Sequence, residues 1–310
     1  MKTFSKENSV GLSYMGLVVV LLVWGSAPLV ATVINTAYTP ALSMAIRGFV
    51  AFTVLFLFSI KKLKNLNKKY FLVAGLTGLF YSVASILQRI GLKTTTPSHY
   101  QFLENLSCLI VPFLMWWFVK RKPNFLTIIS AVVCLISALI LCGFDFTVES
   151  LRFGTGDILC AAAGILFGVN IAGTGAFSKE LDPFLYVMIQ QFVLFICGTA
   201  YTVFLGFSGT AINYDLSFKY IAILITEAVF ISAFCWILRT VAMKYVNATI
   251  VSVIMPLTAV VTVVLSVIFI SEKLTLSLIL GGVLGLLSVY LSVLGDIKYK
   301  KQEQAIEKKG

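Results

Sequence analysis

Residues 11–34 read GLSYMGLVVVLLVWGSAPLVATVI, without a single Asp, Glu, Lys or Arg. A helix needs about 20 mostly apolar residues to cross the hydrocarbon core of a bilayer, and this stretch is long enough. It is also longer than the apolar core of a signal peptide, which has roughly 7–15 residues. A second apolar run begins soon afterwards, at residue 41. We therefore expect residues 11–34 to be retained as a first transmembrane helix.

Apolar runs of this kind recur along the whole chain, and the connections between them are short. Hydrophobic residues make up 59% of the 310 residues and charged residues only 12%, whereas a soluble domain carries about 25% charged residues. The runs lack the alternation of apolar and polar residues that is typical of barrel strands. The sequence therefore predicts an all-α membrane protein with ten transmembrane helices. The expected spans are 11–34, 41–60, 70–92, 97–119, 125–144, 157–176, 183–205, 216–239, 249–270 and 274–294.

The net charge of +11 reports orientation in the membrane rather than nucleic-acid binding. Most of the Lys and Arg residues lie in the connections and the tail, and with ten spans the three main clusters fall on one side. Positively charged connections stay in the cytoplasm, so we expect a multi-pass protein of the plasma (inner) membrane with both termini cytoplasmic. The expected contacts are with the lipid bilayer and not with nucleic acid. The clusters are Lys61, Lys62, Lys64, Lys68 and Lys69; Lys120, Arg121 and Lys122; and Lys298, Lys300, Lys301, Lys308 and Lys309.

The chain contains an internal duplication. Two constant offsets, one for each half of the repeat, align the apolar runs of 11–144 with those of 154–294. We interpret these ranges as two five-span repeats, followed by a basic cytoplasmic tail at 295–310. The aligned pairs include Trp24 with Phe167, Pro40 with Pro183, Arg47 with Gln190, Leu87 with Leu238, and Lys93 with Lys244.

An odd number of spans in each repeat has a consequence for function. The second copy must cross the membrane upside down relative to the first, which gives two inverted five-helix repeats. Secondary transporters are often built this way, with the substrate site at the interface of the repeats and with alternating access produced by rocking of one repeat against the other. The duplication thus favours a secondary transporter.

Several motifs resemble the EamA-like family of the drug/metabolite transporter superfamily. They are Val23-Trp24-Gly25-Ser26, Arg47, Gly91-Leu92-Lys93-Thr94-Thr95, Met255-Pro256 and Ser271-Glu272-Lys273-Leu274-Thr275. The resemblance covers nearly the whole chain and implies two tandem EamA-type domains of ten spans in total. It also implies export or exchange of a small metabolite or amino-acid-like solute. The first repeat departs from the pattern, since Lys120-Arg121-Lys122 stands where the second has Ser271-Glu272-Lys273.

Three charged residues inside the expected spans are the main candidates for the site: Arg47, Glu104 and Glu227. A charge near the bilayer centre costs about 2.5–3.5 kcal/mol on insertion scales, so each should face a cavity or a partner. Arg47 and Glu104 lie at similar expected depths, which permits an ion pair between them. The functional interpretation is an external gate or an anion-binding arginine, and the alternative is a structural pair or a reach of the charged groups to the headgroups. Glu227 lies deeper, where a carboxylate needs a proton, a cation or a donor, and this suits proton coupling.

Further candidates are uncharged. The amides of Gln88, Asn170, Gln190 and Gln191 are candidates for substrate binding, with hydrogen bonding between helices as the alternative role. The aromatic rings of Trp24 and Tyr81 are candidates for the wall of a cavity, and packing against apolar neighbours is their alternative.

The chain lacks the motifs of several other classes. There is no phosphate-binding GxxxxGK[ST] loop, and His99 is the only histidine, so no Ser/His/Asp set can be assembled. We expect a transporter without enzymatic activity, cofactor or metal, which moves a small-molecule substrate down its gradient, with protons or by exchange. An ion channel, a membrane-integral enzyme and a non-transporting scaffold are the alternative classes. A monomer and a homodimer both fit the sequence.

Overall fold

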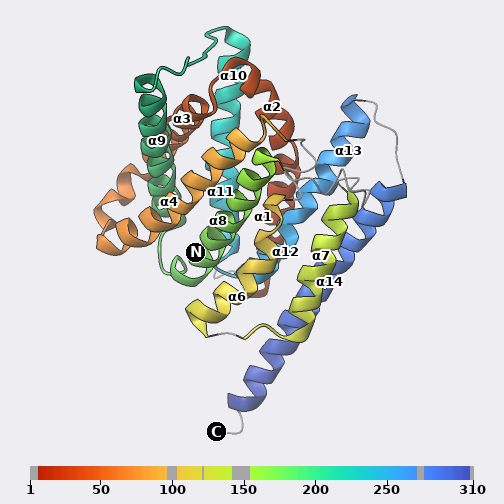
Figure 1. Cartoon of the computed structure of the whole chain (residues 1–310). Coiled ribbons are helices and arrows are strands. Elements are labelled where there is room, and N and C mark those ends of the chain that lie inside the picture. Colours follow the sequence, from red (N-terminus) through yellow and green to blue (C-terminus); the bar gives the residue numbers. More distant parts are fainter. Residues whose placement is uncertain (1–5, 96–102, 121, 142–153, 271–275, 308–310) are drawn as a thin grey trace.

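The computed structural model describes residues 6–95, 103–120, 122–141, 154–270 and 276–307. Within these ranges the regular structure is helical, without strands, and the helices pack into one bundle (Figure 1). The prediction of an all-α membrane fold is thereby confirmed. His99, Arg121 and the motif at 271–275 lie outside the described residues.

The first repeat forms a series of helices that starts near the N-terminus. Its third helix begins at Pro40, where a proline suits the first turn because that turn needs no backbone donor. The fourth begins after Asn67, whose side chain accepts hydrogen bonds from the amides of Lys69 and Tyr70. The elements are α1 (Lys6–Gly25), α2 (Ala27–Ala37), α3 (Pro40–Ser59), η1 (Ile60–Asn65), α4 (Lys68–Gly91), α6 (Ser107–Val119) and α7 (Phe125–Leu141).

The second repeat follows the same order. Its α9 begins at Pro183, the counterpart of Pro40, and Asp182 caps it by accepting hydrogen bonds from two backbone amides. The last helix continues past residue 294 into the expected tail. The elements are α8 (Thr155–Phe177), α9 (Pro183–Phe207), α10 (Phe218–Thr226), η2 (Glu227–Phe234), α11 (Cys235–Ala242), α12 (Ala248–Ile254), η3 (Met255–Leu257), α13 (Thr258–Ile270) and α14 (Leu276–Glu307).

Among the described residues, seven continuous helical segments are long and apolar enough to cross a membrane, and three shorter apolar helices accompany them. The shorter ones are Ser107–Val119, Phe125–Ile140 and Ala248–Thr262, which fall in the expected fourth, fifth and ninth spans. The expected count of ten spans stays a prediction, since the segments are judged by length and composition only.

Helix pairing follows the duplication. The counterparts α3 and α9 pack against each other, and so do α7 and α14 (Figure 1). The pair α4 and α8 has its equivalent in the pair α11 and α1, and the pair α6 and α8 has its equivalent in α13 and α1. The contacts of α3 with α9 and of α7 with α14 thus join counterpart helices, and the other two contacts have equivalents, as an approximate two-fold relation predicts. The two-repeat architecture follows from this pattern.

The first and the eighth of the expected spans depart from a regular α-helix. The first is interrupted at Ser26, between α1 and α2, just before Pro28. The eighth contains η2, a π-helical segment from Glu227 to Phe234. Segments of π-helix are rare, and they occur frequently at functional sites. Both irregularities lie beside the cavity described below.

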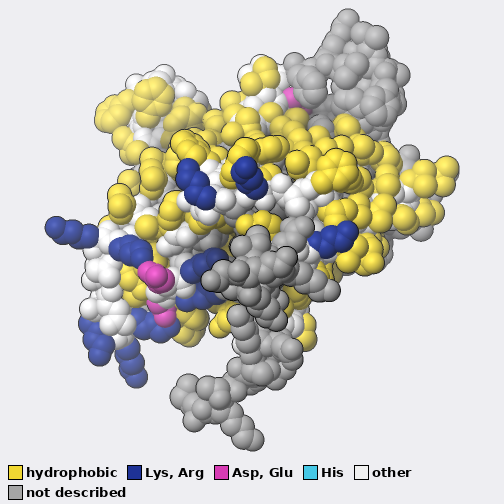
Figure 2. All heavy atoms as spheres, turned by 90° about the horizontal axis from the view of Figure 1, so that it is seen from below, with side chains coloured by type: hydrophobic (Ala, Val, Ile, Leu, Met, Phe, Trp, Pro, Cys, Tyr) yellow, Lys and Arg dark blue, Asp and Glu magenta, His cyan; other side chains and the backbone are white. Residues whose placement is uncertain are grey.

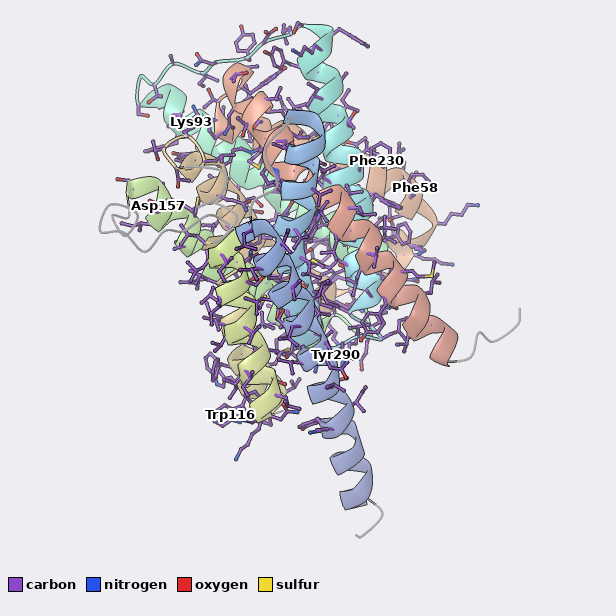
Figure 3. All side chains as sticks on the ribbon, turned by 90° about the vertical axis from the view of Figure 1, so that its right-hand side faces the viewer. Phe58, Lys93, Trp116, Asp157, Phe230 and Tyr290 are labelled. Carbon is purple, nitrogen blue, oxygen red and sulfur yellow. The ribbon has the colours of Figure 1, made fainter. Side chains whose placement is uncertain are left out.

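The outside of the bundle is apolar. Phe58, Trp116, Phe230 and Tyr290 project from different helices (Figure 3), with exposed fractions of 73%, 44%, 54% and 61%. The exposed apolar area is far larger than the surface of a soluble protein normally shows. Such a surface is stable in contact with the hydrocarbon chains of lipids.

One end of the bundle carries many of the Lys and Arg side chains, seen from below in Figure 2. Two ion pairs cross between the repeats there, from Lys62 to Asp182 at 2.8 Å and from Lys69 to Glu180 at 2.5 Å. Lys120 lines a cavity together with residues of the Met243–Asn247 turn, so the connections that carry basic clusters share one end. This placement agrees with the predicted side, and which compartment it faces remains a prediction.

Candidate substrate-binding site

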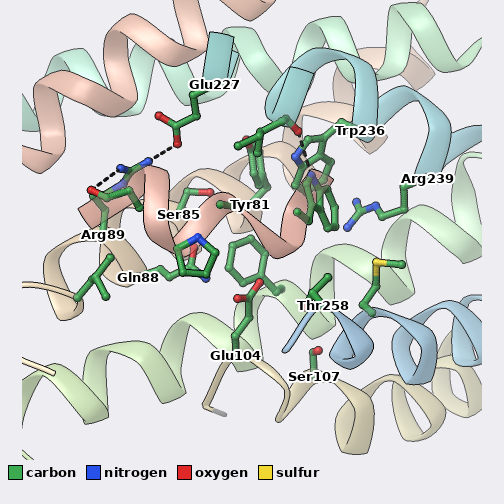
Figure 4. Close-up of a pocket in the computed structure, with 18 of the residues that line it drawn as sticks. Tyr81, Ser85, Gln88, Arg89, Glu104, Ser107, Glu227, Trp236, Arg239 and Thr258 are labelled. Carbon is green, nitrogen blue, oxygen red and sulfur yellow. Dashed lines mark hydrogen bonds and ion pairs between the residues drawn. The ribbon is translucent and has the colours of Figure 1, made fainter. Parts of the chain in front are cut away.

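A cavity of about 100 Å³ lies between the two repeats (Figure 4). The first repeat contributes the lining residues of α1, α2, α3, α4 and the 103–107 segment, and the second contributes those of α8, η2, α11, η3 and α13. The polar lining residues come from both repeats, so a movement of one repeat against the other would change the cavity. They are Arg47, Tyr81, Ser85, Gln88, Arg89, Glu104, Asn105, Ser107, Glu227, Arg239 and Thr258, beside Trp24 and Trp236.

Glu227 is held by two arginines of the first repeat. Its Oε1 lies 3.1 Å from Nη1 of Arg47 and also accepts a short hydrogen bond from Nη2 of Arg89. Arg47 further donates to the hydroxyl of Tyr81 at 3.1 Å, and Arg89 donates to the carbonyl of Ala31 at 3.3 Å. All three charged groups are buried. Two guanidinium groups around one carboxylate leave this cluster with a surplus positive charge.

Aromatic rings form another wall of the cavity. The centre of the Trp236 ring lies 4.1 Å from that of Tyr81 and 5.7 Å from that of Trp24. Phe167 continues this wall, at 6.4 Å from Tyr81. The indole nitrogen of Trp24 donates to the carbonyl of Ile231 at 3.0 Å, which ties the first repeat to the π-helical segment. Such a wall suits an apolar part of a bound molecule.

Glu104 lines the same cavity but does not pair with Arg47. Glu104 and Gln88 both line the cavity (Figure 4), and the ion pair of Arg47 among the described residues is with Glu227. The predicted pair of Arg47 with Glu104 is therefore wrong. Similar depth did not imply adjacency, because α3 packs against α9 and η2, whereas α6, which follows Glu104, packs against α7, α8 and α12.

The remaining candidate amides lie behind the cavity wall rather than in it. Asn170 donates to the carbonyl of Thr77 at 3.0 Å and accepts a hydrogen bond from Arg239 at 2.8 Å. Gln190 donates to the Thr77 hydroxyl at 3.0 Å, and Gln191 donates to the carbonyl of Ser232 at 3.1 Å. These contacts match the alternative role, hydrogen bonding between helices.

The duplication explains why Gln190 lies where it does. Gln190 is the counterpart of Arg47, and Thr77 lies beside the counterpart of Glu227 in the same alignment. The Arg47–Glu227 ion pair thus corresponds to the Gln190–Thr77 hydrogen bond in the other half of the molecule. One of the two equivalent positions carries charges, and the other is neutral.

Two arginines of the cavity were not recognised in the sequence. Arg89 and Arg239 lie near the ends of the expected spans 70–92 and 216–239, so Arg47 was the one cation among the expected intramembrane charges. Both are buried, with exposed fractions of 4% and 2%. The duplication could have identified both arginines. When Leu87 is aligned with Leu238, Arg89 and Arg239 fall at adjacent positions of the repeat.

The model of the EamA-like transporter family matches residues 11–143 and 154–294. An uncharacterized transporter of Archaeoglobus fulgidus is 25% identical over 281 residues, which cover 89% of this chain and 84% of the relative.

One solved crystal structure of a protein has the same fold as this chain. It has a TM-score of 0.73 and 14% sequence identity, and the match covers 94% of this chain and 98% of that one. Since the family model matches almost the entire chain, in two tandem copies that coincide with the repeats of the helix bundle, this integral membrane protein belongs to the EamA-like transporter family.

Proposed function

We propose that this protein is a secondary transporter that moves a small metabolite or amino-acid-like solute by alternating access. The observation that carries the proposal is the cavity between the repeats, crossed by the ion pairs of Arg47 and Arg89 with Glu227. When one repeat rocks against the other, these contacts must change, because each arginine belongs to one repeat and the carboxylate to the other. The transporter family and the duplication support the same conclusion.

We further propose export or exchange across the plasma membrane, with the basic end of the bundle and both termini in the cytoplasm. The gathering of basic connections at one end supports this orientation. Export or exchange rests on the resemblance of the sequence motifs to that family of exporters and exchangers. No catalytic step is needed for this function.

Glu227 is our candidate for coupling transport to protons. In the conformation described here, two guanidinium groups balance its carboxylate. If rocking of the repeats separates them, a deeply buried carboxylate is left without a counter-charge, and binding a proton compensates for that loss. Protonation would then accompany one half of the transport cycle. The substrate gradient alone and exchange are the competing driving forces.

The test is a transport assay in proteoliposomes. A panel of radiolabelled amino acids and small organic acids is measured at two pH values, with and without an imposed pH gradient. We expect accumulation of at least one class of solute, saturation with concentration, and acceleration by the gradient. Solute flux that does not saturate and carries electrical current would instead indicate a channel. Absence of flux for all solutes, in vesicles that hold folded protein, would favour a scaffold.

A further inference from the structure

Arg239 differs from the other two arginines of the cavity in its partners. It lies in the last turn of α11, with an exposed fraction of 2%. Its Nη2 donates to the neutral amide oxygen of Asn170 at 2.8 Å, and its guanidinium carbon lies 3.8 Å from the centre of the Trp236 ring. Among the described residues, no carboxylate forms an ion pair with Arg239, and its Nε has no hydrogen-bond partner.

A buried guanidinium group without a counter-ion is costly. Arg47 and Arg89 avoid this cost by sharing Glu227, whereas the partners of Arg239 in the described part of the chain are an amide and an aromatic face. The planar group offers its donors in pairs, in the geometry that a carboxylate accepts with both oxygens. The ligand that would best complement Arg239 is therefore a carboxylate or a similar anion.

The residues around Arg239 indicate the size and the apolar character of such a ligand. Arg239 and Trp236 line the cavity (Figure 4). Trp24 lines it too, and its ring centre lies 5.7 Å from the guanidinium carbon of Arg239. Tyr81 and Phe167 extend the aromatic wall away from Arg239. An anion bound to Arg239 would thus keep its apolar part against aromatic rings in a cavity of about 100 Å³, which suits only a small molecule.

A second cavity supplies an independent observation. It has a volume of about 390 Å³ and lies at the basic end of the bundle, where Lys120, Lys179 and Lys244 line it. Met243 and Lys244 of this lining follow Arg239 by about one helical turn. A cavity lined by charges of one sign concentrates ligands of the opposite sign. Positive groups therefore mark both the central cavity and the adjacent cavity at the basic end.

We propose that Arg239 is the anion-binding residue of the transport site, and that the substrates are small organic carboxylates with an apolar or aromatic body. This inference rests on the proposed transport function, since it assigns the substrate class of the same cavity. Arg47 and Arg89 have a different task in this scheme. They hold Glu227 and thereby join the repeats, while Arg239 stays available for the ligand.

The experiment measures binding to the purified full chain in detergent. The probe is 3-phenylpropionate, and 3-phenylpropionamide is its neutral analogue of nearly the same shape. Substitution of Trp116 and Trp117 by Phe leaves Trp24 and Trp236 as the tryptophans of the chain, so fluorescence reports the surroundings of Arg239. We expect the carboxylate to bind about tenfold more tightly than the amide, as one charge-assisted contact predicts. If the protein that retains Arg239 binds both probes with equal affinity, the proposal is wrong, and no variant of Arg239 is needed to show it.

Two variants then test whether Arg239 causes the preference for the carboxylate over the amide. In Arg239→Gln the preference for the carboxylate should fall below about twofold, while Lys64→Gln removes an exposed charge of η1 that lines neither cavity and should keep it. Retention of the preference in a folded Arg239→Gln protein would contradict the assignment. Liposome transport separates the two proposals. Carboxylate binding without any transport would refute the transport function alone, and transport of other solutes without carboxylate preference would refute this inference alone.

Discussion

Arg47 and Glu227 lie 180 positions apart in the sequence, and their side chains meet at 3.1 Å between the two repeats. Arg89 reaches the same carboxylate oxygen from α4. One carboxylate of the second repeat therefore holds two helices of the first, which gives Glu227 consequences for both stability and transport.

Replacement of Glu227 by Gln should destabilise the fold. The change leaves two buried guanidinium groups without their counter-charge, and the loss of one partner of a buried ion pair costs about 3–5 kcal/mol. We expect a clearly lower midpoint of thermal unfolding in detergent. The control is Glu180→Gln, which breaks an exposed pair with Lys69 and should leave the midpoint unchanged. Similar midpoints for both variants would show that the Glu227 cluster contributes little.

A double-mutant cycle should couple Arg47 to Glu227 and not to Glu104. Arg47→Gln and Glu227→Gln remove the two sides of one contact, so their effects on unfolding should be non-additive by about 0.5–3 kcal/mol. Glu104 has no ion pair with Arg47 among the described residues, and Glu104→Gln should add to Arg47→Gln within about 0.5 kcal/mol. A larger coupling of Arg47 with Glu104 than with Glu227 would refute the arrangement.

Proton coupling through Glu227 predicts a specific transport defect. Gln keeps the size and hydrogen-bonding capacity of the side chain but cannot bind a proton. We expect Glu227→Gln protein, reconstituted at a temperature where it remains folded, to exchange substrate and to ignore an imposed pH gradient. Glu104→Gln serves as the control, with the response retained. If Glu227→Gln still concentrates substrate in response to the gradient, the proton is carried elsewhere or not at all.

The contact of α3 with α9 depends on two glycines. A Cβ atom at Gly48 would lie 2.5 Å from the backbone nitrogen of Phe195, and one at Gly198 would lie 2.6 Å from that of Ala45. Because backbone cannot yield as a side chain can, Gly48→Ala and Gly198→Ala should each cost about 1–3 kcal/mol of unfolding free energy.

Gly75→Ala is the matched control for these two substitutions. A Cβ there has no neighbour within 4 Å, and alanine has a higher helix propensity than glycine, by about 0.8–1.0 kcal/mol. The substitution should therefore be neutral or stabilising. Thermal unfolding of the three variants tests the interface, and equal effects at all three glycines would contradict close packing of α3 on α9.

Cysteine labelling tests the orientation. In a background without native cysteines, Asn65→Cys in the basic connection should be protected from a membrane-impermeant maleimide in intact cells. Tyr214→Cys, in the exposed connection between α9 and α10, should react, since the two connections lie at opposite ends of their helices. Labelling of Asn65→Cys from outside, with Tyr214→Cys protected, would invert the predicted topology.

The class of the protein could be predicted from the amino-acid sequence. Uncharged runs such as 11–34 are long enough to span a bilayer, and the aligned pairs Pro40 with Pro183 and Leu87 with Leu238 revealed the repeats. These are local properties, since hydropathy and length require no knowledge of neighbouring helices. They also indicated that Arg47 and Glu227 need partners, because an intramembrane charge is costly wherever it lies.

The partners of these residues follow from helix packing and could not be predicted from the sequence. The contact of Arg47 with Glu227 instead of Glu104 depends on which face of α3 meets the second repeat, and apolar runs do not specify helix rotation. Arg89 and Arg239 were missed because each lies near the end of an apolar run, where a long cation can equally reach the headgroups. Packing of α4 and α11 in the bundle buries both arginines instead, and so completes the charged cavity.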